Sequence, residues 1–157
     1  MRAVAQRPRS PRDRPTADEP EVDYTRLLEF RTGLRQFLRW SERAAKEAGV
    51  TPAQHQLLLA VRGHPDPRGP SISDLAEYLA LGHQATVGLV NRSVKAGLVE
   101  RRQASEDRRV SRLRLTPSGR RLLARLSQAH LEELARLAPR LRILWRGLEP
   151  RWRPPMS

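Results

Sequence analysis

The sequence predicts a mainly α-helical fold that carries one small β-hairpin. Three observations support this prediction. Apolar residues recur at helical spacing along most of the chain, and segment 109–115 alternates polar and apolar residues as a half-buried strand does. Two helix starts are marked by a capping residue followed by proline, Thr51-Pro52 and Thr116-Pro117.

The composition favours a nucleic-acid partner. The 157 residues suit one domain with extensions, and 38% hydrophobic residues allow a core. A net charge of +13 favours a polyanion, most often nucleic acid and less often an anionic membrane surface. Nearly all the positively charged residues are arginine, whose planar guanidinium can make paired hydrogen bonds to a phosphate or to the edge of a guanine. Codon bias in a GC-rich genome explains the arginine excess equally well.

Several function classes are excluded by what the sequence lacks. Without cysteine there are no disulfides, thiolate metal sites or thiol redox sensors. No apolar run approaches the roughly 18 residues of a membrane span, and no secretion signal is evident. The four histidines lack metal-ligand spacing, and no phosphate-binding loop is present. We expect a cytoplasmic protein that is not an enzyme, with no catalytic residues, metal, cofactor or membrane partner.

The N-terminal half begins with a tail. Residues 1–20 are rich in arginine and proline and predict a disordered tail, more readily a solvated extension than a nucleic-acid arm. A helix follows from Tyr24 to Ala48, with an apolar stripe and an arginine-rich opposite face, and Gly49 stops it. Because this stripe has few partners nearby in sequence, we expect it to pack on the C-terminus or on a second subunit.

The middle of the chain predicts three short helices. Thr51 and Gln54 predict a capping box for a helix that ends at Gly63, and loop 64–70 follows. Ser71 caps the next helix, which runs to about Leu79. After a turn at 81–82, a third helix covers about 83–96. Its expected buried residues are Ala85, Val87, Leu89, Val90 and Val94.

A hairpin and two helices complete the chain. Residues 98–102 and 109–115 predict strands around a polar turn, with Arg112 and Arg114 on one face and Leu113 and Leu115 on the other. The next helix opens at Thr116-Pro117. We expect Pro139 to interrupt it, a short helix to follow, and residues 150–157 to be a flexible tail.

Two helices followed by a basic hairpin are the order of a winged helix-turn-helix, in which a groove-sized helix lies beside a cationic wing. Three motifs carry a closer resemblance. They are Ser73-Asp74-Leu75-Ala76 leading to Leu79, then Gly97-Leu98-Val99-Glu100-Arg101, and then Asp107-Arg108-Arg109-Val110 followed by Leu113, Leu115, Thr116, Pro117 and Gly119. With these motifs, the segment from Tyr24 to Leu137 resembles the MarR family of bacterial transcriptional regulators.

The resemblance implies a homodimer that reads double-stranded DNA. Residues 21–149 would form the winged helix-turn-helix domain, with 51–116 as its DNA-binding lobe and 21–50 and 117–149 as dimerisation helices. Such a dimer would act as a sequence-specific regulator, in our interpretation a repressor, on a pseudo-palindromic operator. Many members release DNA when a small aromatic or phenolic effector binds between the lobes. The chain departs from the family near Ala104, where an additional acidic residue is common.

The DNA-reading candidates fall in two groups. The recognition helix offers exposed residues near its start and one turn later, namely His83, Gln84, Thr86, Gly88, Asn91 and Arg92. Gln84 could bond adenine and Thr86 a thymine methyl, while His83 could instead cap the helix and Asn91 could be merely solvated. The wing offers Arg101, Arg102, Asp107, Arg108, Arg109, Arg112 and Arg114. Either Arg108 or Arg109 would enter the minor groove, and the resemblance favours Arg109 as the partner of Asp107.

Three residues are candidates for an effector pocket: Arg39, Trp40 and His55. Two alternative functions remain at this point. One is a non-specific nucleic-acid or chromosome-binding protein, which the basic tail and net charge favour. The other is a winged-helix module for protein contact, against which the arginines on both wing strands argue.

Overall fold

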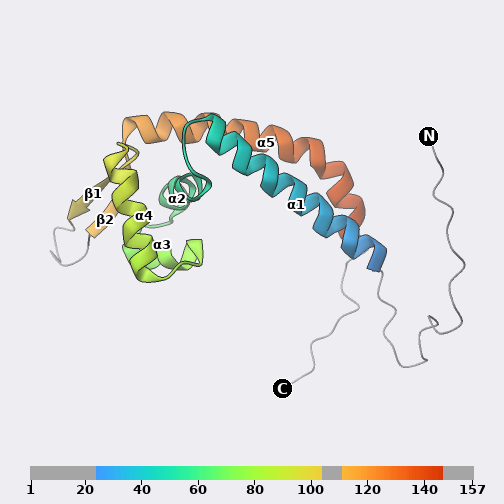
Figure 1. Cartoon of the computed structure of the whole chain (residues 1–157), viewed down its shortest axis with the longest axis horizontal. Coiled ribbons are helices and arrows are strands. Elements are labelled where there is room, and N and C mark those ends of the chain that lie inside the picture. The colour runs from blue at the N-terminus through green and yellow to red at the C-terminus, as the bar shows by residue number, and fades with distance from the viewer. Residues whose placement is uncertain (1–23, 104–110, 147–157) are drawn as a thin grey trace, which may run out of the picture.

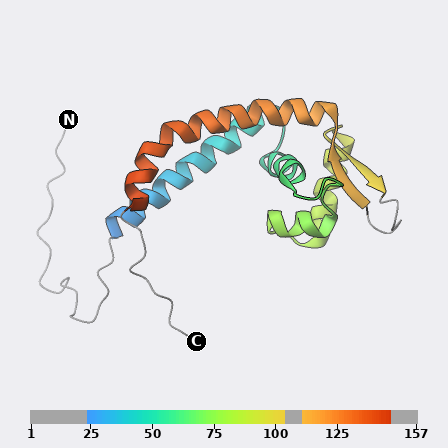
Figure 2. The same cartoon turned by 180° about the vertical axis from the view of Figure 1, so that it is seen from behind.

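The computed structural model describes the backbone of residues 24–103 and 111–146 and the side chains of 24–103 and 111–139. Over these residues there are five helices and one two-stranded sheet. Two long helices form an arm, and the other three helices and the sheet form a lobe at one end of it (Figures 1 and 2). The predicted mainly α-helical fold with a small β-wing is confirmed. The predicted tails and the tip of the hairpin lie outside the described residues.

The arm consists of α1 (Tyr24–Glu47) lying alongside α5 (Pro117–Arg146) (Figure 1). Ser41 and Ala45 of α1 are buried against the rest of the protein. Leu34 and Leu38, on the same predicted stripe, stay 45% and 48% exposed. The predicted amphipathic helix is therefore present, but α5 covers only part of its apolar face.

The expected break at Pro139 is wrong, because α5 continues through this proline to Arg146. Proline inside a helix removes one hydrogen bond and costs about 3 kcal/mol. The extended packing of α5 along α1 offsets this cost, and tertiary packing commonly overrides local propensity. Figure 2 shows that α5 curves over its C-terminal part.

The lobe contains α2 (Pro52–Gly63), α3 (Ile72–Leu79), α4 (His83–Lys95), β1 (Val99–Gln103) and β2 (Ser111–Leu115). The predicted capping box of α2 is present, with the Thr51 side chain accepting from the Gln54 backbone. A second capping box joins Ser71 to Asp74 at the start of α3. Both boxes satisfy backbone donors that a helix start would otherwise leave unpaired.

The core of the lobe is apolar and is shared by all its elements. Its fully buried side chains include Leu57, Leu58, Leu75, Val90 and Leu113. Each comes from a position that the predicted helix or strand pattern places inward. The first strand lies one residue later than the predicted range 98–102, and the start of the predicted strand 109–115 lies outside the described residues. In the described part of the chain, no helix is long and apolar enough to span a bilayer.

The wing is an antiparallel pair in which Val99 is opposite Leu115 and Arg101 is opposite Leu113. Leu113 and Leu115 are buried and Arg114 is exposed, which confirms the predicted alternation. Loop 64–70 runs along β2, because the Leu113 backbone N–H donates to the Pro70 carbonyl at 2.9 Å. This contact seats the wing on the loop between α2 and α3.

Candidate nucleic-acid interface

The outward face of α4 carries four residues at successive helical turns. Thr86, Leu89, Val90 and Ser93 form the buried face. Opposite them lie Gln84, Gly88, Asn91 and Lys95, spaced by four, three and four residues, and all but Gly88 are exposed. We call these four residues the outward ridge. Lys95 was absent from the sequence-based candidates, although its spacing from Asn91 could have indicated it.

The prediction that Thr86 contacts DNA is wrong, because Thr86 is fully buried. Its hydroxyl donates to the Gly82 carbonyl at 3.1 Å, and the Ser93 hydroxyl donates to the Leu89 carbonyl at 2.9 Å. These bonds within the helix satisfy the hydroxyls and permit their burial. The expected burial of Ala85 and Val94 is also wrong, since both are exposed.

The first turn of α4 leaves His83 free of a capping role. Gly82 occupies the N-cap position, and no side chain caps the helix, so the alternative in which His83 caps it is wrong. Arg92 lies over Gly88, with its Nη1 atom 3.3 Å from the place that a Cβ of Gly88 would occupy. The missing side chain of Gly88 therefore leaves room for Arg92 on the helix surface.

Strand β1 is tied to α4 by a side-chain hydrogen bond. The Arg101 guanidinium donates to Asn91 Oδ1 at 2.8 Å, which fixes the orientation of this exposed amide. Arg102 pairs with Glu100 at 2.9 Å. The Arg101 bond brings the wing and the outward ridge into one basic surface.

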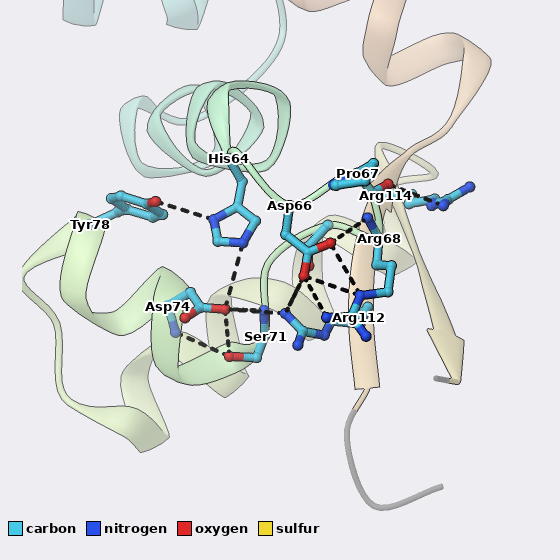
Figure 3. A network of polar contacts seen from close by, with 10 residues as sticks. His64, Asp66, Pro67, Arg68, Ser71, Asp74, Tyr78, Arg112 and Arg114 are labelled. Atoms are coloured by element: carbon cyan, nitrogen blue, oxygen red, sulfur yellow. Dashed lines mark hydrogen bonds and ion pairs between the residues drawn. The ribbon is translucent and has the colours of Figure 1, made fainter. Parts of the chain in front are cut away.

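Arg112 is half-buried in a polar network beneath the wing (Figure 3). Its guanidinium donates to the Gly69 carbonyl at 3.1 Å and lies 3.6 Å from Asp74 and 3.8 Å from Asp66. Figure 3 shows Asp66 between Arg112 and Arg68, and Arg68 bonds this carboxylate at 2.9 Å. Arg112 therefore holds β2 to the loop and to α3, rather than facing solvent as a phosphate contact.

The two carboxylates of this network stay ionised. Hydrogen bonds from Arg68 lower the pKa of Asp66 to about 2, with a smaller effect of the Arg112 charge. Hydrogen bonds from Ser71 lower the pKa of Asp74, and His64 and Arg112 add to this effect. His64 reaches both Asp74 and the hydroxyl of Tyr78 (Figure 3). The network thus joins the loop, α3 and the wing by charge.

We expect Arg112→Ala to destabilise the protein by about 1–3 kcal/mol, because two partly buried carboxylates and one carbonyl lose a charged donor. Urea denaturation at neutral pH measures the change. Arg114→Ala is the matched control, since Arg114 lies on the same strand and is exposed, with one bond to the Pro67 carbonyl at 3.2 Å. Equal losses in both variants would contradict the anchoring role of Arg112.

The wing candidates are thus divided. Arg101 and Arg102 lie on the exposed surface of β1, Arg112 is an internal anchor, and Arg114 faces the loop. The remaining candidates, Asp107, Arg108 and Arg109, lie outside the described residues.

The candidates for the effector pocket separate in the structure. Trp40 and His55 converge on His130 of α5, with ring centroids 4.8 Å and 4.6 Å from it. His130 was not among the residues that the sequence indicated for this pocket. Arg39 is exposed on α1. The proposed trio is therefore not one site.

The His55–His130 pair joins the lobe to the arm. His130 Nδ1 lies 2.6 Å from the Leu126 carbonyl, which can only accept, so Nδ1 carries the proton. His130 Nε2 then accepts from the Ser41 hydroxyl at 2.7 Å. His55 is 3% exposed, and burial and then the His130 imidazole lower its pKa below the usual 6.5. Burial and the lowered pKa both favour a neutral His55 imidazole.

The stability of the protein should therefore fall as the pH drops below about 6.5. Below this pH, His55 in the unfolded chain binds a proton, whereas His55 in the folded protein has a lower pKa and binds it less readily. Protonation therefore favours unfolding below about pH 6.5 and has no such effect above it. Urea midpoints at pH 7.5 and 5.5 measure the effect. His55→Leu should reduce the acid loss, whereas His83→Leu, at an exposed position of α4, should keep it. Identical pH dependence in both variants would contradict the assignment to His55.

Two adjoining cavities lie where α1 meets α5. The first, of about 650 Å³, is bounded by the α1–α2 turn, the end of α4 and the start of α5. The second, of about 500 Å³, is lined by Trp40, Arg43 and Leu126, among others. Ala48 and Arg125 line both, and neither Arg39 nor His55 lines either. The described residues hold no cluster of three side chains able to bind a metal ion.

Comparisons with known proteins agree with this geometry. The sequence pattern of the MarR family matches residues 48–110. A proposed transcriptional regulatory protein for the hcr operon of Thauera aromatica is 31% identical over 111 residues. This match covers 71% of the chain and 65% of the relative, so the chain spans 65% of the length of that curated protein.

Solved structures share the fold. The chain is similar to a MarR family transcription regulator at 27% identity, with a TM-score of 0.64 over 74% of this chain and 75% of that one. It is also similar to a mutant of Staphylococcus aureus MepR bound to an oligodeoxyribonucleotide, at 20% identity. There the TM-score is 0.61 over 76% of this chain and 84% of that one.

Proposed function

The chain belongs to the MarR family through residues 48–110, and we propose from this premise that it is a transcriptional regulator that binds duplex DNA. The outward ridge of α4, joined to a basic strand by the Arg101–Asn91 bond, carries the proposal. A helix of this size fits the major groove, where Gln84 and Asn91 can make bidentate bonds to adenine. The solved complex of MepR with an oligodeoxyribonucleotide supports the same use of the fold.

The finer part of the proposal is a homodimer that represses from a pseudo-palindromic operator. The arm leaves a set of leucines 39–67% exposed, namely Leu27, Leu28, Leu34, Leu38, Leu131 and Leu134. Several exposed leucines on one helical arm are typical of an interface, and a second copy would cover them. Two-fold symmetry would then present two α4 helices to half-sites one helical turn apart.

A small aromatic or phenolic effector is part of the same proposal. The cavities at the α1–α5 junction combine an indole, Trp40, with the cations Arg43 and Arg125. Such a lining suits an aromatic ring that carries an anionic group. The cavity at Trp40 is lined by the arm alone, and the adjoining cavity adds Gln54, Ala96 and Leu98 of the lobe. An occupant that extends into both would touch the arm and the lobe together and could change the spacing of the two α4 helices.

In the decisive experiment, genomic DNA fragments that the protein binds are selected, and unrelated duplex DNA is then added as a competitor. We expect one preferred site to be retained, with log affinity falling against log salt by about 0.9 per phosphate neutralised. The double variant Arg108→Ala, Arg109→Ala should bind that site more weakly. Equal affinity for all sequences would instead favour the non-specific chromosome-binding alternative. Absence of duplex binding at low salt would favour a module for protein contact.

A further inference from the structure

A third cavity, of about 280 Å³, lies on the side of the lobe between the end of α2, loop 64–70, β2 and the start of α5. No residue of α4 lines it, so it is separate from the outward ridge. Its floor is apolar, with Val61, Leu113 and Leu115 among its lining residues. We call it the lateral cavity.

Three guanidinium groups from three elements line the lateral cavity: Arg62 of α2, Arg114 of β2 and Arg120 of α5. The one carboxylate in the lining is Asp66. That carboxylate is already bonded by Arg68 and faced by Arg112, neither of which lines the cavity. The positive charge of the three lining arginines is therefore left without a counter-charge among the described residues.

Backbone carbonyls hold two of these arginines in place without neutralising them. Arg114 donates to the Pro67 carbonyl at 3.2 Å, and Arg120 donates to the Leu115 carbonyl at 2.8 Å. A guanidinium has five N–H donors, so each keeps several for a ligand. Arg62 makes no hydrogen bond or ion pair with the described residues. Three guanidiniums without a counter-charge, two of them held by backbone carbonyls, can bind an oxyanion by paired and charge-assisted hydrogen bonds.

We propose that the lateral cavity binds a phosphate group. The volume accommodates a phosphate with a small attached organic part, and the distance from α4 favours a free phosphorylated compound over the backbone of the bound duplex. Because its walls come from α2, the loop, β2 and α5, a bound phosphate would tie the base of the wing to the arm. This inference does not depend on the proposed regulatory function.

The test uses the full-length protein without DNA and inorganic phosphate as the ligand. Thermal unfolding is followed against phosphate concentration and against chloride at matched ionic strength. We expect a saturable stabilisation by phosphate alone. Arg62→Gln should weaken phosphate binding by about tenfold or more, as expected for a lost charge-assisted bond. Arg62 is the first choice because its removal breaks no internal hydrogen bond.

Arg31→Gln is the matched control, since Arg31 is exposed on α1 far from the cavity and loses the same charge. It should keep the phosphate affinity of the wild type. An equal loss in both variants, or no stabilisation beyond that of chloride, would overturn the proposal. A duplex-binding assay then identifies the source of the phosphate. Unchanged DNA affinity in Arg62→Gln supports a free compound, and a parallel loss supports a DNA phosphate in the same cavity.

Discussion

Gly69→Ala is expected to destabilise the protein by about 3–5 kcal/mol, enough to unfold the lobe in part of the molecules. Gly69 has a φ of +92°, which an L side chain rarely adopts, and a Cβ there would lie 2.1 Å from the Leu113 carbonyl oxygen. Relief would require β2 to move away from the loop. That movement would break the Leu113–Pro70 backbone bond, and with it the seat of the wing.

Alanine variants of two other glycines, compared in urea denaturation, separate the effect of the left-handed backbone at Gly69 from the effect of its close contact with Leu113. Gly49 has a φ of +84° but open space around it, so Gly49→Ala should cost only the left-handed conformation, about 1–2 kcal/mol. Gly63 has neither problem, and Gly63→Ala should be neutral or slightly stabilising. If Gly69→Ala cost no more than Gly49→Ala, the close approach of loop and strand would be contradicted.

The second large effect concerns DNA affinity. Gln84→Glu should lower the affinity for a selected duplex by about 10- to 100-fold while leaving stability unchanged. The carboxylate cannot donate to adenine N7, and it repels the phosphates of the groove. Its position in the first turn of α4 is favourable for a negative charge, so the helix should not be weakened.

Gln36→Glu is the control for Gln84→Glu, because it makes the same chemical change at an exposed position of α1. Fluorescence anisotropy with labelled duplex should show near wild-type affinity for this variant, and thermal unfolding should show intact folding for both. Equal loss of affinity in the two variants would mean that net charge alone sets DNA binding, and α4 would lose its assigned role.

Local sequence signals predicted the elements of this fold well. The Thr51 and Ser71 caps are specific to helix starts, and the alternation along β2 predicted which leucines are buried. Prediction failed where distant parts of the chain decide the outcome. Pro139 does not end α5, because α1, about a hundred residues earlier in the sequence, packs along it.

The candidate site was predicted less completely, for two physical reasons. The Thr86 hydroxyl is bonded to a carbonyl of its own helix and can therefore be buried. Its polar character had suggested that it lies on the exposed side of α4. Arg112 looks like any wing arginine in the sequence, and only the folded loop brings Asp66 and Asp74 to it. The meeting of His55 with His130 likewise depends on tertiary packing between segments far apart in the chain.

The passage from β2 to α5 has a mechanical consequence. Thr116 alone separates them, and its hydroxyl donates to the Gly97 carbonyl at 2.6 Å and accepts from the Gly119 backbone at 3.0 Å. The wing and the arm thus turn together as one lever. Its 30 residues span about 45 Å at 1.5 Å per residue, so a tilt of about 10° at the wing moves the far end by about 8 Å. In the proposed dimer, such a tilt would be enough to change the spacing of the two α4 helices relative to one turn of DNA.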